Sequence, residues 1–199
     1  TRTVNVVDTI APTIVLNGNN PLILECATAY TEPGATVNDD CDANPALTIS
    51  GTVDHTTLGN YTVTYTATGA SGNSLQKTRT VNVVDTTPPV ITLNGAADIT
   101  LECGVDSYTE PGATADDACD GNVTVTISGS VTDAVGDYII TYSATDATGN
   151  SDSATRTVHV RDTIAPAITL IGGTVSLECN LESYQEPGFT VSDDCDTSP

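Results

Sequence analysis

The sequence repeats the same segment at a constant interval. Residues 1–8 read Thr-Arg-Thr-Val-Asn-Val-Val-Asp, residues 78–85 are identical, and residues 155–162 are a close copy, so each start lies 77 residues after the last. A fixed period of this kind indicates a tandem array in which each copy is one structural unit. We therefore divide the chain into the final strand of a preceding repeat (1–7), two whole repeats (8–84 and 85–161) and the first half of a further repeat (162–199).

The charge balance narrows the classes of partner. Twenty-six Asp and Glu residues stand against five Lys and Arg residues, which gives a formal net charge of −21. That charge excludes nucleic-acid binding through a basic groove and argues against adhesion to anionic membranes. An acidic surface attracts cations instead. The segment contains no signal peptide, membrane span or lipidation motif, so we expect no membrane insertion here.

Six cysteines fall as two per repeat, without partner histidines, which does not resemble a zinc site. Regular pairs in small modules indicate disulfides and therefore an oxidising, extracellular compartment. The first cysteine of each repeat shares the parity of core-facing residues, so we expect it to meet the second cysteine of its own repeat. The expected pairs are Cys26 with Cys41, Cys103 with Cys119, and Cys179 with Cys195. A bridge between repeats, such as Cys26 to Cys119, is the alternative.

Apolar residues alternate with period two, and no stretch keeps a helical period. In the second repeat Tyr138, Ile140, Tyr142 and Ala144 share one face, and the first repeat copies this at residues 61–67. Short alternating segments separated by Gly, Asn, Asp and Pro predict an all-β fold, namely tandem immunoglobulin-like antiparallel β-sandwiches arranged as a rod. The tyrosines at 61 and 138 stand where such folds place a tyrosine corner.

Acidic residues recur at five positions of the repeat. These are the junction Asp, the Glu before the first cysteine, the Glu of Glu-Pro-Gly, and a paired and a single Asp around the second cysteine. In a sandwich the loops carrying several of them lie beside the junction Asp, where their oxygens suit Ca²⁺. Alternatively, they are solvated turn residues. The candidate calcium ligands are Asp8, Asp39, Asp40, Asp42, Asp85, Glu110, Asp116, Asp117, Asp120, Asp146, Asn150, Asp162, Asp193, Asp194 and Asp196. Gly69 replaces Asp146 in the first repeat, so the sites differ in strength.

The other polar residues give no support for catalysis. His55 and His159 lie at non-equivalent positions, and the Ser and Thr residues have no recurring His–carboxylate partners, so we expect no enzyme activity. Arg2, Arg79 and Arg156 recur on the parity of the inward valines. We expect their stems to lie along the sandwich edge and each guanidinium group to pair with a carboxylate.

Three motifs carry a family resemblance. They are Asp-Thr-Thr-Pro-Pro-Val-Ile-Thr-Leu-Asn-Gly (85–95), Tyr-Thr-Glu-Pro-Gly-Ala-Thr-Ala (108–115) and Tyr-Ser-Ala-Thr-Asp-Ala-Thr-Gly-Asn (142–150). As a set they resemble the bacterial immunoglobulin-like repeats of large surface proteins, which are also attached to some pesticidal crystal proteins. A fainter likeness runs to hyalin repeats. The resemblance implies a β-sandwich array on a secreted or surface-anchored protein, and the added cysteines go beyond the family's minimal pattern.

These features together predict a structural extracellular protein. We expect a surface stalk or filament that is held by disulfides, stiffened by Ca²⁺, and partnered by neighbouring repeats or other copies of the chain. The alternative is an adhesin or a glycan-binding accessory module of a larger secreted protein, which would instead bind a cell-surface or glycan ligand.

Overall fold

The computed structural model describes residues 1–180 and 183–196 of the chain. Two compact units emerge from it. Unit 1 comprises Thr1–Pro88 with two short segments, Asp117–Gly121 and Asp146–Asn150, while unit 2 comprises Pro89–Asp116, Asn122–Thr145 and Ser151–Pro199. Within the described ranges, no helix has the length and apolar character needed to cross a membrane.

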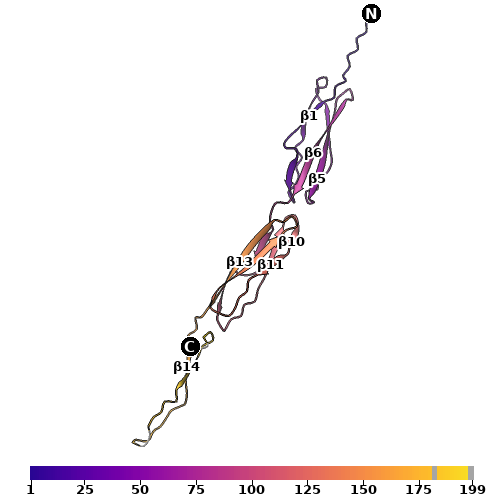
Figure 1. Cartoon of the computed structure of the whole chain (residues 1–199). Coiled ribbons are helices and arrows are strands. Elements are labelled where there is room, and N and C mark those ends of the chain that lie inside the picture. The colour runs from indigo at the N-terminus through magenta and orange to yellow at the C-terminus, as the bar shows by residue number, and fades with distance from the viewer. Residues whose placement is uncertain (181–182, 197–199) are drawn as a thin grey trace. The chain divides into compact units, whose positions relative to one another are not determined.

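Unit 1 is built from six strands in two sheets. They are β1 (Thr13–Leu16), β2 (Leu22–Glu25), β3 (Ala35–Asn38), β4 (Ala46–Ser50), β5 (Gly59–Thr68) and β6 (Ser74–Val84). One sheet pairs β1 with β3, and the other has the order β2-β6-β5-β4. The long antiparallel hairpin of β5 and β6 runs through the centre of the larger sheet (Figure 1). The predicted all-β sandwich class is therefore confirmed.

The core of unit 1 follows the predicted alternation. Val63, Tyr65 and Ala67 of β5 are buried together with Ile14 of β1 and Val81 of β6. Burial of these apolar side chains is the main source of stability in so small a sandwich. The tyrosine corner also forms, since the Tyr61 hydroxyl donates to the Thr57 carbonyl at 2.8 Å.

Unit 2 repeats this plan and continues into the next repeat. Its strands are β7 (Val90–Leu93), β8 (Asp98–Glu102), β9 (Ala113–Asp117), β10 (Gly121–Val123), β11 (Val125–Ser128), β12 (Gly136–Thr145), β13 (Ser151–Arg161), β14 (Ala167–Leu170) and β15 (Phe189–Ser192). The sheets are ordered β10-β9-β7, β11-β12-β13-β8 and β14-β15. Strands β10, β11 and β13 can be followed in Figure 1. Ile140, Tyr142, Ala144, Val158 and Val160 form the buried face of β12 and β13, as the sequence predicts.

One strand pair in each sandwich is parallel rather than antiparallel. Strand β2 pairs in parallel with β6, and β8 pairs in parallel with β13. As a result, β2 and β8 each end beside the C-terminal end of their partner strand. The Cys26 amide therefore donates to the Val84 carbonyl at 2.7 Å, and the Cys103 amide donates to the Arg161 carbonyl at 2.7 Å. This arrangement carries the first cysteine of a repeat to the start of the next repeat.

Candidate functional site

The disulfides join consecutive repeats, which corrects the pairing expected within each repeat. Cys26 is bonded to Cys119, and Cys103 to Cys195, with Cα–Cα distances of 5.5 and 5.3 Å. The alternative bridge from Cys26 to Cys119 is thus confirmed. The expected pairs Cys26–Cys41, Cys103–Cys119 and Cys179–Cys195 are wrong. Among the described residues, Cys41 and Cys179 are free and both are exposed.

The physical reason lies at the strand ends. Parity places the first cysteine on the core side, but it does not say at which end of the sandwich the cysteine lies. Cys41 follows β3, whose Asn38 pairs with Thr13 at the beginning of β1, whereas Cys26 follows β2 beside the end of β6. The two cysteines of one repeat therefore lie at opposite ends of its strands, too far apart for the short reach of a disulfide.

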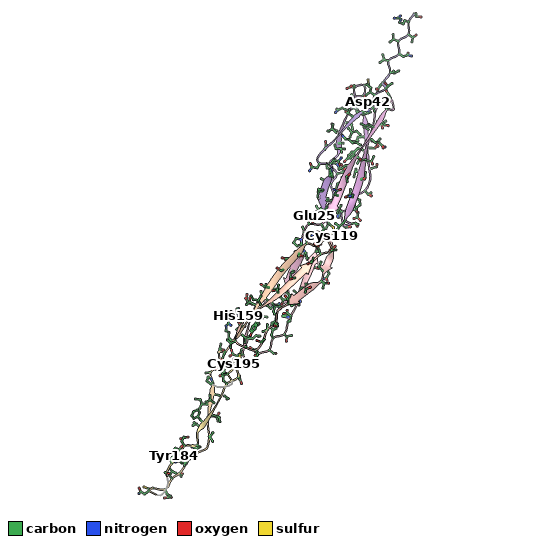
Figure 2. All side chains as sticks on the ribbon, in the orientation of Figure 1. Glu25, Asp42, Cys119, His159, Tyr184 and Cys195 are labelled. Carbon is green, nitrogen blue, oxygen red and sulfur yellow. A yellow bond between two sulfur atoms is a disulfide. The ribbon has the colours of Figure 1, made fainter. Side chains whose placement is uncertain are left out.

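The first bridge lies beside a group of acidic residues within unit 1. Glu25 and Cys119 appear next to each other in Figure 2, since Glu25 precedes the bonded Cys26. Oxygen atoms of Asp85, Asp117 and Asp146 lie within 4.8 Å of one another, and all three residues are buried. Their exposed fractions are only 8, 7 and 7%. We call these three residues the acidic cluster.

Each member of the acidic cluster comes from a different segment. Asp85 follows β6 at the junction between repeats, Asp117 ends β9, and Asp146 follows β12. Asp117 Oδ1 accepts from the amides of Cys119 (2.7 Å) and Asp120 (3.0 Å). The position of Asp117 Oδ1 is thus explained by a local turn, since an aspartate side chain often accepts from backbone amides two or three residues further on. Asp117 Oδ2 is also buried, but it has no hydrogen-bond partner among the described residues.

Hydrogen bonds hold the third member of the cluster. Asp146 Oδ1 accepts from the Gly149 amide at 2.6 Å and the Asn150 amide at 2.7 Å, and Asp146 Oδ2 accepts from Asn150 Nδ2 at 2.7 Å. Although burial alone would raise the pKa of Asp146, the hydrogen bonds from Asn150, Thr148 and Gly149 lower it. The Asn150 amide group thus donates within the site.

The junction aspartate shows the opposite effect. Burial, together with the negative charges of Asp117 and Asp146, raises the pKa of Asp85 above its usual value. A raised pKa means that the ionised carboxylate is unfavourable in this environment. A bound cation would relieve this cost, since it would lie among carboxylates that repel one another.

The structure brings only some of the predicted ligands to this cluster. Asp120 lies beside it, in a group with Asp85 and Cys119, and Asp120 Oδ2 accepts from the Ala147 amide at 2.6 Å. Asp116 is exposed on β9, opposite Val90. Glu110 lies instead in the hydrogen-bonded network of Arg156 described below.

Incomplete versions of the cluster exist in the flanking repeats. In the first repeat Asp39 makes the same turn as Asp117, accepting from the amides of Cys41 (2.8 Å) and Asp42 (2.9 Å). A Cβ atom added to Gly69 would lie 3.4 Å from Asp39 Oδ2, so Gly69 occupies the place that Asp146 holds in the second repeat. Asp8 is half-buried and Asp40 is exposed.

The third repeat contributes a junction aspartate and a cysteine loop. Asp193 accepts from the amides of Cys195 (2.8 Å) and Asp196 (2.9 Å). Asp162 is exposed, but partial desolvation by neighbouring atoms, together with the charges of Asp193, Asp196 and Glu102, raises its pKa. Asp194 is exposed.

Two glutamates that are not among the candidate ligands fix the start of the next repeat. Glu25 accepts from the Thr86 amide at 2.7 Å and from Thr86 Oγ1 at 2.9 Å, and Glu102 accepts from the same two groups of Thr163 at 2.6 and 2.7 Å. These hydrogen bonds lower the pKa of both glutamates. Each glutamate therefore fixes the Asp-Thr step that begins the next repeat. The sequence did contain a signal for this contact, because the pairs Glu-Cys and Asp-Thr recur together in each repeat.

Each sandwich has an arginine on an inner strand, rather than an edge strand, of its four-stranded sheet. Arg79 and Arg156 are fully buried. Arg156 Nη1 lies 2.8 Å from Glu110 Oε1 and 2.7 Å from the Tyr142 hydroxyl, and Nη2 donates to the Asn94 carbonyl at 2.5 Å. The expected pairing with a carboxylate is confirmed for both arginines, although the partner distance is longer, at 3.9 Å, for Arg79 and Glu32. Their expected position along the sandwich edge is wrong.

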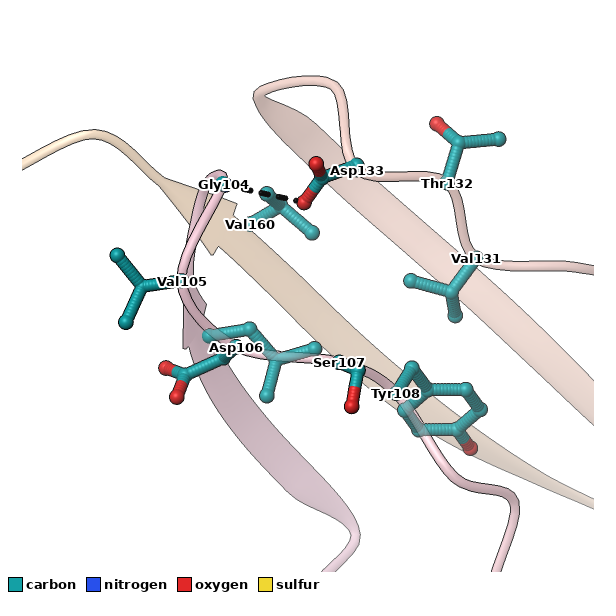
Figure 3. Close-up of a pocket in the computed structure, with 10 residues that line it drawn as sticks. Gly104, Val105, Asp106, Ser107, Tyr108, Val131, Thr132, Asp133 and Val160 are labelled. Carbon is teal, nitrogen blue, oxygen red and sulfur yellow. Dashed lines mark hydrogen bonds between the residues drawn. The ribbon is translucent and has the colours of Figure 1, made fainter. Parts of the chain in front are cut away.

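Unit 2 also contains a pocket of about 370 Å³ (Figure 3). Three of its polar side chains already form hydrogen bonds within the protein. Asp133 Oδ1 accepts from the Gly104 amide at 3.1 Å, Asp106 Oδ2 from the Glu102 amide at 2.7 Å, and the Tyr108 hydroxyl donates to Glu110 at 2.5 Å. The pocket therefore offers few free groups for recognition of a polar ligand.

Comparison with known proteins agrees with this architecture. The sequence matches the family model described as "Bacterial surface protein, Ig-like domain" over residues 14–83 and 91–160. It is 36% identical to Hyalin from Strongylocentrotus purpuratus over 176 residues, which is 81% of this chain and 14% of that protein. It is also 36% identical to Hyalin from Lytechinus variegatus over 183 residues, covering 82% of this chain and 33% of that protein. The chain thus spans no more than a third of the length of these relatives.

Solved structures give more distant similarities. One contains the M60 catalytic domain with the CBM51-1 and CBM51-2 domains from Clostridium perfringens ZmpB, with a TM-score of 0.47 and 14% identity over 84% of this chain and 33% of that chain. Another is Drosophila N-cadherin EC1-4, with a TM-score of 0.37 and 15% identity over 77% of this chain and 50% of that chain. The family match covers most of each of the two whole repeats, and the chain therefore belongs to the family of bacterial surface protein Ig-like domains.

Proposed function

We propose that this chain is a structural segment of an extracellular surface stalk or filament, in which Ca²⁺ stiffens the junctions between repeats. Membership of a surface Ig-like family supports the location, and so do the two disulfides, because such bonds persist in oxidising compartments. The engaged polar groups of the pocket favour this role over a glycan-binding module. Binding of the chain to a glycan array would favour the adhesin alternative.

The observation that carries the structural role is the pattern of the disulfides. The bridges close the overlapping segments 26–119 and 103–195, so a pulling force applied to the two termini does not have to pass through most of the chain. The shortest covalent path runs through residues 1–26, 103–119 and 195–199 only. Even a fully unfolded oxidised chain therefore stays short, which suits a load-bearing element.

Single-molecule force spectroscopy tests this role. At ~3.6 Å per residue, the oxidised chain should extend to roughly 160 Å, and the reduced chain to roughly 710 Å. The variant Cys26→Ser/Cys119→Ser keeps the second bridge and should reach an intermediate length of roughly 380 Å. An oxidised chain that extends as far as the reduced chain would contradict a load-bearing arrangement.

The calcium proposal rests on the acidic cluster. Three carboxylates are buried together, burial and the charges of Asp117 and Asp146 raise the pKa of Asp85, and Asp117 Oδ2 lacks a hydrogen-bond partner in the described part of the chain. Buried charges are expected to be paired or to coordinate a metal. Hard oxygen donors suit Ca²⁺, which would neutralise the repulsion and tie the junction residue Asp85 to the two loops.

Thermal melts with Ca²⁺ and with EDTA test the site, using two neighbouring variants with the same loss of charge. Calcium at a hundred times its dissociation constant should stabilise the wild type by about 2.7 kcal/mol. Asp117→Asn should abolish this gain and should be no less stable than wild type in EDTA, because it removes one of three repelling carboxylates. Asp116→Asn changes an exposed aspartate and should keep the full gain.

The comparison of the two variants distinguishes a specific calcium site from general screening of charge. Equal loss of the calcium response in both variants would indicate general screening of the chain's negative charge. If calcium does not stabilise the wild type at all, the aspartates are solvated turn residues and not calcium ligands. Either result would refute the calcium site while leaving the structural role to the force measurement.

A further inference from the structure

Both disulfides follow one rule. We call Cys26, Cys103 and Cys179 the leading cysteines, since each follows a Leu-Glu pair, and Cys41, Cys119 and Cys195 the trailing cysteines, since each lies in an aspartate-rich loop. In each bridge, a leading cysteine bonds to the trailing cysteine of the following repeat. The rule leaves one cysteine of each kind in the described chain, the trailing Cys41 and the leading Cys179.

The loop around Cys41 already has the conformation of the bonded loops. The amides of Cys41 and Asp42 donate to Asp39 Oδ1 at 2.8 and 2.9 Å. The corresponding distances are 2.7 and 3.0 Å in the bonded loop of Cys119, and 2.8 and 2.9 Å in that of Cys195. The loop therefore needs no disulfide to hold its shape, and the exposed Cys41 thiol is presented as its bonded counterparts are.

The backbone after Cys179 also matches the bonded leading cysteines. Asn180 has a φ of 65°, while the residues after Cys26 and Cys103, Ala27 and Gly104, have φ values of 62° and 68°. A positive φ is uncommon for Ala and Asn, so its recurrence at this position marks the same turn. The Cys41 loop thus has the hydrogen bonds of its bonded equivalents, and the residue after Cys179 has nearly the same backbone φ as the residues after Cys26 and Cys103.

We propose that Cys41 and Cys179 are complementary attachment points, each of which forms a disulfide with the opposite kind of cysteine in a further repeat. In a solution of this chain alone the further repeat belongs to a second copy, so Cys179 of one copy bonds to Cys41 of the next. The two thiols lose two protons and two electrons, which reduce one disulfide oxidant such as oxidised glutathione to two thiols. In a longer polypeptide, neighbouring repeats supply the same partners.

Single variants of the full chain test this complementarity in a glutathione redox buffer. Cys41→Ser leaves only the leading thiol free, and Cys179→Ser leaves only the trailing thiol free, while the bridges Cys26–Cys119 and Cys103–Cys195 stay intact. Non-reducing electrophoresis should show a ladder of linked chains for the wild type. Each variant alone should remain monomeric, and a mixture of the two should give a single dimer band.

The composition of that dimer is the decisive result. Tagging one variant by mass should show heterodimer in excess over either homodimer by at least about tenfold, well above the twofold excess of random pairing. Peptide mapping should find the bond between Cys41 and Cys179. Random oxidation would give only twice as much heterodimer as either homodimer, and that ratio would overturn the proposal. So would the absence of linkage, or bonds from either thiol to Cys26, Cys103, Cys119 or Cys195.

This inference goes beyond the proposed structural role and does not depend on calcium. Its failure would leave the force–extension prediction untouched, because that prediction uses only the two bridges already present. Conversely, linkage between copies could occur in a chain whose acidic cluster binds no cation. The two sets of measurements therefore separate the proposals.

Discussion

In the first repeat, Gly69 stands at the position that Asp146 holds in the acidic cluster of the second repeat. The aspartates at 8 and 39 are present there, and Asn73 Nδ2 donates to the Asp8 carbonyl at 3.0 Å, much as Asn150 Nδ2 donates to the Asp85 carbonyl at 3.3 Å. Gly69 is buried, and a Cβ atom at this position would meet its nearest neighbour, Asp39 Oδ2, at an ordinary contact distance of 3.4 Å. An aspartate could thus enter without displacing the backbone.

We predict that Gly69→Asp gives the first repeat a calcium site like the one proposed for the acidic cluster. Isothermal titration calorimetry should show one more bound ion than in the wild type, because a third carboxylate now converges on Asp39 and Asp8. In EDTA the variant should be less stable than wild type, since the added charge is buried without a partner. Gly69→Asn has the same shape without the charge and should keep the wild-type stoichiometry. If Gly69→Asn also binds one more ion than the wild type, a third carboxylate is not what creates the site, and the prediction is wrong.

At the scale of elements, one arginine network fixes each sandwich. Arg156 on β13 lies 5.4 Å from the centre of the Tyr142 ring on β12, and it also contacts Glu110 in the loop before β9. The Tyr142 hydroxyl donates to Glu110 at 2.5 Å. Burial would raise the pKa of Glu110, but the hydrogen bonds from Tyr108, Tyr142 and Gly112, with the charge of Arg156, lower it below 4.5. The network therefore joins the two sheets through an ionised glutamate.

This pKa shift predicts a specific dependence of stability on pH. Because the folded-state pKa of Glu110 lies below that of the unfolded chain, its contribution is present above about pH 4.5 and disappears as the pH falls through the lowered value. Glu110→Gln should destabilise unit 2 by about 2 kcal/mol at neutral pH, since it leaves a buried arginine without its anion. In urea titrations this difference from wild type should shrink in acid. Glu178→Gln, at an exposed glutamate, serves as the control. A difference that stays constant with pH would mean that the charge of Glu110 is not involved.

The elements also show which features the sequence could predict. Period-two alternation identified the buried faces of β5, β6, β12 and β13, because a strand directs alternate side chains to opposite faces. Apolar alternation also placed Arg79 and Arg156 on the inward parity. Their full burial could not be predicted from it, because that depends on carbonyl groups such as that of Asn94, which lies far away in the sequence.

The cysteine pairing depends on a different kind of information. Parity defines the face of a strand, whereas pairing also requires the end of the sandwich at which each strand stops. The parallel pairing of β2 with β6 and of β8 with β13 decides that end, and a sequence with short strands does not reveal strand order. In the same way, the sequence suggested many candidate ligands, but only the fold selects Asp85, Asp117 and Asp146 as the buried group.

At the scale of the whole molecule, each disulfide bonds two cysteines of one compact unit, although the loop from Cys26 to Cys119 also includes residues 89–116 of unit 2. Cys26 and Cys119 both belong to unit 1, and Cys103 and Cys195 both belong to unit 2. The bonded cysteines are 93 and 92 residues apart in the sequence. In the chain-entropy model a loop of this length stabilises the fold by about 4 to 5 kcal/mol, because it restricts the unfolded chain. The loop of Cys26–Cys119 contains strands of both units, whereas the loop of Cys103–Cys195 contains none of β1 to β6, so the two bridges should act on different parts of the chain.

We predict that each bridge stabilises the repeats whose strands lie in its loop. In Cys26→Ser/Cys119→Ser, hydrogen exchange should show the free energy of opening in β5 and β6 falling by about 4 kcal/mol. Opening of β12 and β13 should also become easier, because the lost loop contains β7, β8 and β9 of the same sandwich. In the matched variant Cys103→Ser/Cys195→Ser, β12 and β13 should open more easily, whereas opening in β5 and β6, which lie outside that loop, should change by less than about 0.5 kcal/mol. If this second variant weakened β5 and β6 as much as β12 and β13, the repeats would unfold as one cooperative body, and the bridges would have to be understood as stabilising the array rather than its members.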